Sequence, residues 1–185
     1  ARGCATGNWV ADTLGRKPTE LIEELIGKPA ATAAARALAP VSLSEGHELT
    51  QADVAQAYCQ APLLGQPKFI RIPKELRPIL GVPEGLHNPV CRLDRALYGL
   101  VRSCFDWEKY SADKLRAGGW KQVCEQAERN VWVKKTKRGL ARIVKYVDDL
   151  TLGCHPSQTR AVWAEIASMF DIDDPEEINR FLGVV

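Results

Sequence analysis

Three carboxylates stand where they could do chemistry together. Asp148 and Asp149 interrupt an apolar, β-prone run, "RIVKYVDDLTLG" (142–153), and the flanking residues predict two short strands joined at the Asp-Asp tip. A solvated turn is the simplest interpretation, because Asp is common in turns. A further acid, Asp53 in "QADVAQAY" (51–58), also ends an extended run. If the strand that ends at Asp53 pairs beside this hairpin, the three carboxylates meet at one edge of a sheet.

Such a cluster favours a particular kind of chemistry. Neighbouring carboxylates raise one another's pKa unless a cation neutralises them. Carboxylate oxygens suit hard divalent ions, and Mg²⁺ prefers one or two carboxylates together with substrate phosphates. Two such ions about 4 Å apart stabilise the attacking and leaving oxygens of an in-line phosphoryl displacement. The pattern permits nucleotidyl transfer, while spacing alone leaves a structural turn open.

Composition sets the broad class. The 185 residues fit one ordinary domain, and 45% apolar with 26% charged residues is typical of a soluble globular protein. There is no apolar run of about 18 residues and no signal-peptide core, so we expect an intracellular protein without a membrane span, in a cytoplasmic particle or the nucleus. The first residue is not Met, which suggests a piece of a longer protein. The net charge of +2 is too small to indicate nucleic-acid binding by itself.

The pattern of apolar residues predicts the elements that must position the acids. Strands are expected in a run that ends at Asp53, at 68–73, at 90–93, in a hairpin of 130–135 with 140–147, after Asp149, and in the last residues, 179–185. Helices are expected at 18–27, 29–40, 96–117 and 157–170. The order predicts an α+β fold in which a mostly antiparallel sheet carries helices on one face.

Several segments, taken in order, resemble one protein family. "DVAQAY" (53–58) followed by "YVDD" (146–149) is similar to the catalytic pair of reverse transcriptase palm domains. "VCRLDRALYGLVRSCFDW" (90–107) resembles the copia-type retrotransposon members in particular. "KFIRIPKEL" (68–76), "GGWKQVCEQAERNVWVKK" (118–135) and "MFDIDDPEEINRFLGVV" (169–185) resemble further family segments at family spacing. The similarity runs from about residue 29 to the end of the chain.

The resemblance implies a fold and an activity. It implies a polymerase palm-like antiparallel sheet in residues 51–185, truncated before the thumb, with a partial fingers-like segment in residues 1–50. The implied activity is RNA-directed DNA synthesis within a retrotransposon polyprotein, using two Mg²⁺ ions, with Mn²⁺ as a possible substitute. The implied partners are an RNA or DNA template-primer, deoxynucleotide triphosphates, and the rest of the polyprotein, with integrase upstream and ribonuclease H downstream.

The resemblance also assigns roles to single residues. Asp53, Asp148 and Asp149 match the catalytic carboxylates that hold the metal ions, assisted by the backbone carbonyl of Val54. The family aromatic at Tyr58 excludes a 2′-hydroxyl, the group that distinguishes ribonucleotides from deoxynucleotides. Gly99 matches the glycine at which template and nucleotide closely approach the backbone. Arg102 stands where the family has another residue, and we expect that it could still meet the phosphate of the nucleotide. The primer and template contacts implied are Tyr146, Phe181, Leu182 and Gly183.

One departure from the family pattern leaves an alternative open. The family's Lys-Gln-Ala-Pro stands here as Val101-Arg102-Ser103-Cys104, so a Lys and a Pro are lost. The chain could therefore be a catalytically inactive, truncated relic that keeps the palm fold and at most weak nucleic-acid binding. A different palm-fold enzyme, such as a nucleotidyl cyclase, is a more distant alternative that "LYGL" and "YVDD" together oppose.

Overall fold

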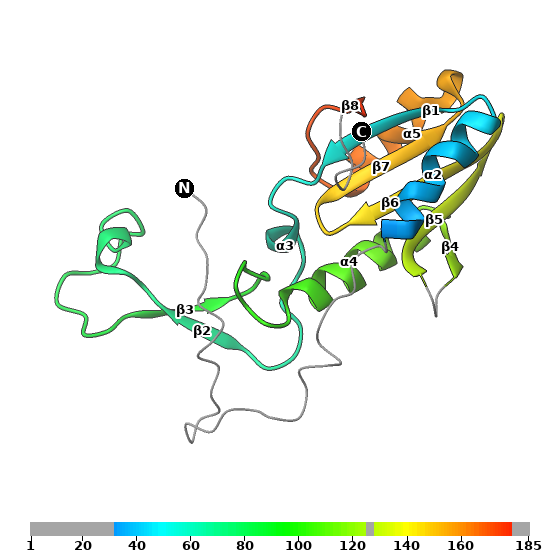
Figure 1. Cartoon of the computed structure of the whole chain (residues 1–185). Helices are drawn as coiled ribbons and strands as arrows, with labels where there is room; N and C mark the ends of the chain where they lie inside the picture. The colour runs from blue at the N-terminus through cyan, green and yellow to red at the C-terminus, as the bar shows by residue number, and fades with distance from the viewer. Residues whose placement is uncertain (1–31, 125–127, 179–185) are drawn as a thin grey trace.

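The fold centres on one six-stranded antiparallel sheet. The structure, a computed structural model, describes residues 32–124 and 128–178. The order across the main sheet is β4-β5-β6-β7-β1-β8, and β2 and β3 form a separate two-stranded sheet (Figure 1). The strands are β1 (Glu48–Asp53), β2 (Lys68–Arg71), β3 (Val90–Leu93), β4 (Lys121–Cys124), β5 (Glu128–Thr136), β6 (Gly139–Tyr146), β7 (Asp149–Cys154) and β8 (Glu176–Glu177).

The helices cover both faces of the main sheet, which corrects the prediction that they lie on one face. They are α2 (Thr32–Ser44), α3 (Ala57–Gln60), α4 (Ser103–Ala117) and α5 (Pro156–Met169), with a short 3₁₀ turn, η1 (Lys74–Leu76). Side chains of α4 and α5 pack in the main core, together with alternate sheet residues such as Ile143 and Leu152. On the opposite face, Leu38 of α2 packs against Val144. The second helical layer follows from the alternation of side chains along β6. Val144 points to the face opposite to Ile143, and because it is also apolar, that face must be shielded from solvent as well.

The predicted hairpins are confirmed. Strand β5 pairs with β6, and β6 pairs with β7, so the 142–153 run is a hairpin with Val147 and Asp148 at its tip. The run that ends at Asp53 forms β1 and pairs along the other side of β7. The sheet therefore places the end of β1 beside the hairpin tip, as the positioning of the carboxylates requires.

Two helix boundaries differ from the prediction. Helix α2 continues through Pro40 to Ser44, past the expected end at residue 40. Helix α4 begins at Ser103 rather than at residue 96, because the preceding turn contains Gly99 with a φ of 89°. The Ser103 hydroxyl secures this turn by donating to the Leu97 carbonyl at 2.6 Å. The helix expected at 18–27 and the strand expected at 179–185 lie outside the described residues.

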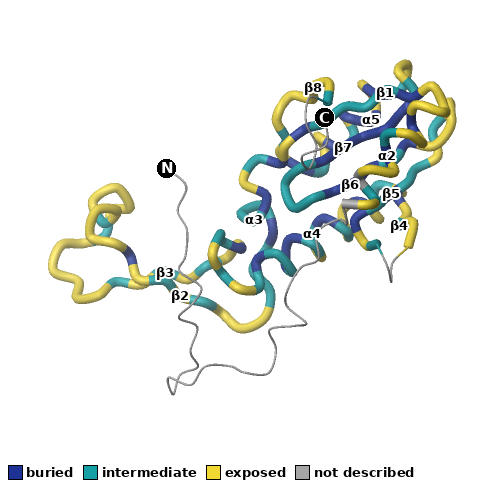
Figure 2. The backbone as a smooth tube through the Cα atoms, viewed as in Figure 1, coloured by how far each residue is buried: buried dark blue, intermediate teal, exposed yellow. Residues whose placement is uncertain are grey.

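The segment 62–95 extends away from the main sheet as an arm that carries β2 and β3 (Figure 1). Most of the arm is exposed, whereas the buried residues concentrate in the main sheet and its helices (Figure 2). The predicted boundary after residue 50 falls inside β1, and α2 also packs on the main sheet. Residues 32–50 and the strands that follow therefore share one packed unit.

Candidate active site

The pairing of β1 with β7 brings two of the three predicted carboxylates together. Asp53, the last residue of β1, is the cross-strand partner of Asp149, the first residue of β7. Their side chains share a hydrogen bond, and Asp148 lies next to them in the turn that precedes β7. Asp53 is exposed, and Asp148 and Asp149 are half-buried, so the group is open to solvent and to a ligand.

The carboxylates of this group repel one another. Partial burial, followed by the charges of Asp53 and Asp148, raises the pKa of Asp149 from 3.8 to about 6. Within residues 32–124 and 128–178, no three or more His, Cys, Asp or Glu side chains are arranged to hold a metal ion. Two adjacent carboxylates nevertheless form a donor set that fits Mg²⁺, since this ion takes its remaining ligands from water and substrate phosphates.

The backbone of the hairpin tip is held by the residue that follows β1. The Val54 N–H donates to the Asp148 carbonyl oxygen at 2.8 Å, and Val54 itself is buried. Val147 has a φ of 56°, an unusual value for a β-branched residue. The tip is therefore a tight two-residue turn fixed beside the end of β1.

Tyr58 lies in α3, a few residues after Asp53, and is half-buried. Its ring centroid is 4.6 Å from that of Tyr98. Burial, followed by contact with Cys104 and the charge of Asp148, raises the pKa of the Tyr58 hydroxyl above its ordinary value. The structure thus brings Tyr58 into the neighbourhood of Asp148, while its role at the sugar stays a prediction.

The two other predicted nucleotide contacts lie in the turn and first residues leading into α4. Gly99 has a φ of 89° and is exposed, so its backbone is accessible and its conformation favours glycine. The Arg102 guanidinium donates to both carboxylate oxygens of Asp106, from Nε at 2.9 Å and from Nη2 at 2.9 Å. Asp106 is fully buried, so this ion pair anchors the start of α4, and phosphate binding by Arg102 stays a prediction.

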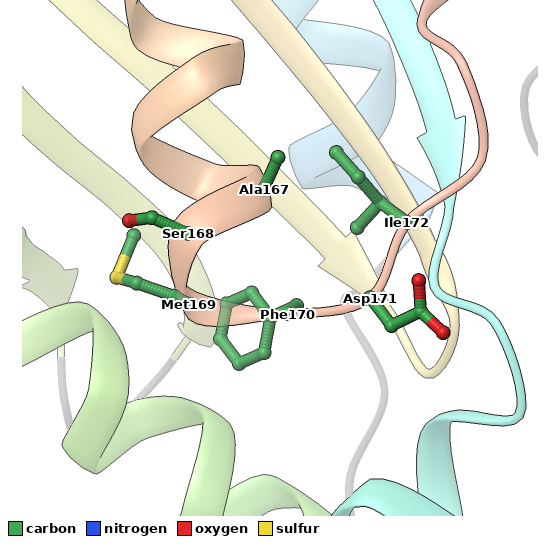
Figure 3. Close-up of a pocket in the computed structure, with 6 residues that line it drawn as sticks. All are labelled: Ala167, Ser168, Met169, Phe170, Asp171 and Ile172. Carbon is green, nitrogen blue, oxygen red and sulfur yellow. The ribbon is translucent and has the colours of Figure 1, made fainter.

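Tyr146, predicted to support the primer, is the cross-strand partner of Asp149 within the hairpin and packs against the cluster of Leu38 and Val144. The predicted primer contacts Phe181, Leu182 and Gly183 lie outside the described residues. A hollow formed by residues 167–172 at the end of α5 contains none of the three carboxylates (Figure 3).

Three residues of α4 and β6 were not predicted to bear on the site. Asp106 could have been found from its i,i+4 spacing to Arg102. Lys145 is buried on the α4 face of β6. It could have been found because residues two apart in a strand share a face, which places Lys145 on the same inward face as Ile143. Trp107 is fully buried, and its indole N–H donates to the Val147 carbonyl at 2.6 Å.

Comparison with known proteins agrees with this geometry. Residues 11–185 match the family model described as reverse transcriptase (RNA-dependent DNA polymerase). The chain belongs to this family. The resemblance to copia-type reverse transcriptases is thereby confirmed.

A curated relative points the same way. The chain is 24% identical over 145 residues to a protein of Arabidopsis thaliana named "Retrovirus-related Pol polyprotein from transposon RE1". The aligned part is 78% of this chain and 9% of the polyprotein, so the chain spans a small share of that relative. In the part of the reverse transcriptase chain that the structure describes, no helix combines the length and apolar composition that crossing a bilayer requires.

Proposed function

We propose that this chain catalyses RNA-directed DNA synthesis at the β6–β7 hairpin tip. The observation that carries the proposal is the pairing of Asp53 with Asp149 across β1 and β7, with Asp148 in the adjoining turn. Asp53 and Asp148 are 95 residues apart in the sequence and belong to different strands and turns. An incidental acidic turn would not need a third acid from a distant strand beside it.

Asp53, Asp148 and Asp149, with the backbone carbonyl of Val54, would hold two Mg²⁺ ions, or Mn²⁺ in their place. Bound there, the ions would supply electrostatic stabilisation for attack by a primer 3′-hydroxyl on the α-phosphate of a deoxynucleotide. The raised pKa of Asp149 supports this assignment, because carboxylates that repel one another gain stability when a cation binds.

The surrounding residues would select and orient the substrates. The Tyr58 ring, which lies at a tilt against Tyr98, would lie under the sugar and exclude a 2′-hydroxyl. Gly99 would allow close approach of the nucleotide, Arg102 would contact phosphate, and Tyr146 would support the primer. We assign residues 51–185 to the palm and residues 1–50 to part of the fingers, of which residues 32–50 pack on the palm sheet. The chain would belong to an intracellular polyprotein with integrase and ribonuclease H.

Primer extension tests the proposal. We expect extended products when the chain is mixed with a DNA primer on an RNA template, deoxynucleotides and Mg²⁺. Asp148→Asn should lower the extension rate by at least about 100-fold, the scale for removing one group that stabilises transition-state charge. Asp113→Asn, which removes an exposed carboxylate on α4, serves as the matched control and should keep the wild-type rate.

The inactive relic is the outcome that would overturn the proposal. It predicts no extension by a wild-type chain that is folded, or extension that Asp148→Asn leaves unchanged. The ion pair of Arg102 with Asp106 is the observation that favours it, because this pair occupies most of the guanidinium that would meet phosphate.

A further inference from the structure

The tip of the β6–β7 hairpin has a backbone conformation that needs support. Tyr146 pairs with Asp149, so Val147 and Asp148 form a two-residue loop. Val147, the first loop residue, has a φ of 56°. Glycine is the usual residue with positive φ in such loops, and a β-branched residue in this conformation is strained. Contacts from outside the hairpin must therefore hold Asp148 in place.

One of these contacts comes from α4. The Trp107 indole Nε1–H donates to the Val147 carbonyl oxygen at 2.6 Å, and the Trp107 side chain is fully buried. The other comes from the residue that follows β1, because the Val54 N–H donates to the Asp148 carbonyl at 2.8 Å. Both carbonyls of the two-residue loop are thus bound, one by each flanking element.

Further contacts hold Trp107 in place within α4. The Ser111 hydroxyl donates to the Trp107 carbonyl at 2.8 Å, and the Lys145 ammonium donates to the Ser111 hydroxyl oxygen at 2.6 Å. The Lys145 nitrogen also lies 5.6 Å from the centre of the Trp107 ring. Lys145 of β6 is thus linked through Ser111 to Trp107 of α4. Trp107 in turn bonds to Val147, two residues after Lys145.

Another aromatic side chain lies against the Trp107 ring. Phe170 lies edge-on to Trp107, with ring centroids 5.6 Å apart. Phe170 follows α5 and points from the end of that helix toward α4 (Figure 3). The indole therefore has little freedom to rotate away from the Val147 carbonyl.

We propose that Trp107 is a positioning residue for Asp148, acting through its hydrogen bond to the Val147 carbonyl at the hairpin tip. The proposal rests on the proposed function, in which Asp148 is a catalytic carboxylate. Trp107 does not contact substrate in this account. It fixes the backbone from which the Asp148 carboxylate projects, and it should affect the catalytic step more than substrate binding.

Trp107→Phe removes the indole N–H and retains an aromatic ring. Trp163→Phe is the matched control, because Trp163 is also buried and its Nε1 donates to the Thr50 hydroxyl at 2.8 Å, away from the tip. Each variant loses one hydrogen bond and similar packing, so the two should lose similar stability. Their effects should separate only at the hairpin.

Two measurements on the full chain test the proposal. Residue-resolved amide hydrogen exchange should show the Val54 amide exchanging about five to ten times faster in Trp107→Phe, as expected for loss of a hydrogen bond of roughly 1 kcal/mol, and unchanged in Trp163→Phe. Primer extension should show kcat at least about tenfold lower in Trp107→Phe, with KM for the deoxynucleotide changed less than about threefold. Trp163→Phe should keep both constants.

Equal Val54 exchange in the two variants would overturn the proposal, as would an equal loss of kcat in both. If the wild-type chain extends no primer, the proposed function fails, and the exchange comparison alone still decides whether Trp107 holds the tip.

Discussion

At the scale of single residues, the carboxylate that serves the proposed chemistry weakens the fold. The folded-state pKa of Asp149 is about 6, above its ordinary value of 3.8. Linkage then requires that the ionised carboxylate destabilises the folded chain above pH 6, and that this cost disappears as the proton is taken up between pH 6 and pH 4. The folded chain is therefore more stable when a proton or a cation balances the acids.

Asp149→Asn should raise the free energy of unfolding at pH 7 by about 1 kcal/mol without divalent ions, a figure reduced for the partial exposure of the group. The advantage should vanish by pH 4, where wild-type Asp149 is protonated. Urea unfolding at both pH values measures the difference, and Asp113→Asn provides an exposed control with little expected change. A variant less stable than wild type at pH 7 would contradict this account of Asp149.

At the scale of elements, α2 and β7 approach one another through a glycine. A Cβ added to Gly153 would overlap the Ser42 hydroxyl and lie 3.1 Å from the Ser42 Cβ. Ser42 is fully buried, and its hydroxyl has no hydrogen-bond partner among the described residues. Glycine at position 153 thus allows the helix to cover the face of the sheet opposite to α4 and α5.

Gly153→Ala should lower the free energy of unfolding by about 2 kcal/mol, within the range for overpacking a tight core. Ser42→Ala alone should be close to neutral, because it removes an unpartnered buried hydroxyl. The double variant should recover about half of the loss, since the Ser42 Cβ remains close. Strictly additive effects in urea unfolding would show that the two residues do not meet.

The elements also show how far the sequence could predict the structure. The alternation in 130–147 and the acidic tip predicted the hairpin, and the run ending at Asp53 predicted its neighbour. Position 96 could not be excluded from α4, because the apolar spacing continues across the turn that Gly99 and Ser103 form. The second helical layer escaped prediction because the cover that Val144 requires becomes evident only once the strands are paired.

The contacts that support the site join elements that are distant in the sequence, so they could not be predicted from it. The bond from Trp107 to the Val147 carbonyl joins residues 40 apart, and no local pattern specifies it. A buried Trp does require a partner for its N–H, which predicts that a bond exists but not where it goes.

At the scale of the whole molecule, one buried charge ties the sheet to α4. Lys145 is 2% exposed, and burial lowers its pKa from 10.5 to about 8, with Glu108 and Cys104 of α4 acting in the opposite direction. Because the unfolded chain holds this proton up to higher pH, the stability of the wild-type protein should rise with pH between 8 and 10.5, as far as this group is concerned.

Replacing Lys145 with Met should remove that dependence. At pH 7, Lys145→Met should be more stable than wild type, and the difference should shrink by about 2 to 3 kcal/mol on raising the pH to 10. Unfolding in urea across this range is the measurement, and the cysteine titrations common to both proteins cancel. A difference that does not change with pH would show that Lys145 is not buried in its charged form.

Metal binding tests the central claim most directly, because it does not depend on turnover. Electron paramagnetic resonance can follow free Mn²⁺ during titration of the full chain. The account predicts saturable binding that weakens at least about tenfold in Asp53→Asn and in Asp148→Asn, the scale of losing one ligand interaction of roughly 1.4 kcal/mol, and is retained in Asp113→Asn. Equal affinity in all four proteins would contradict the assignment of these carboxylates as the metal site of a polymerase.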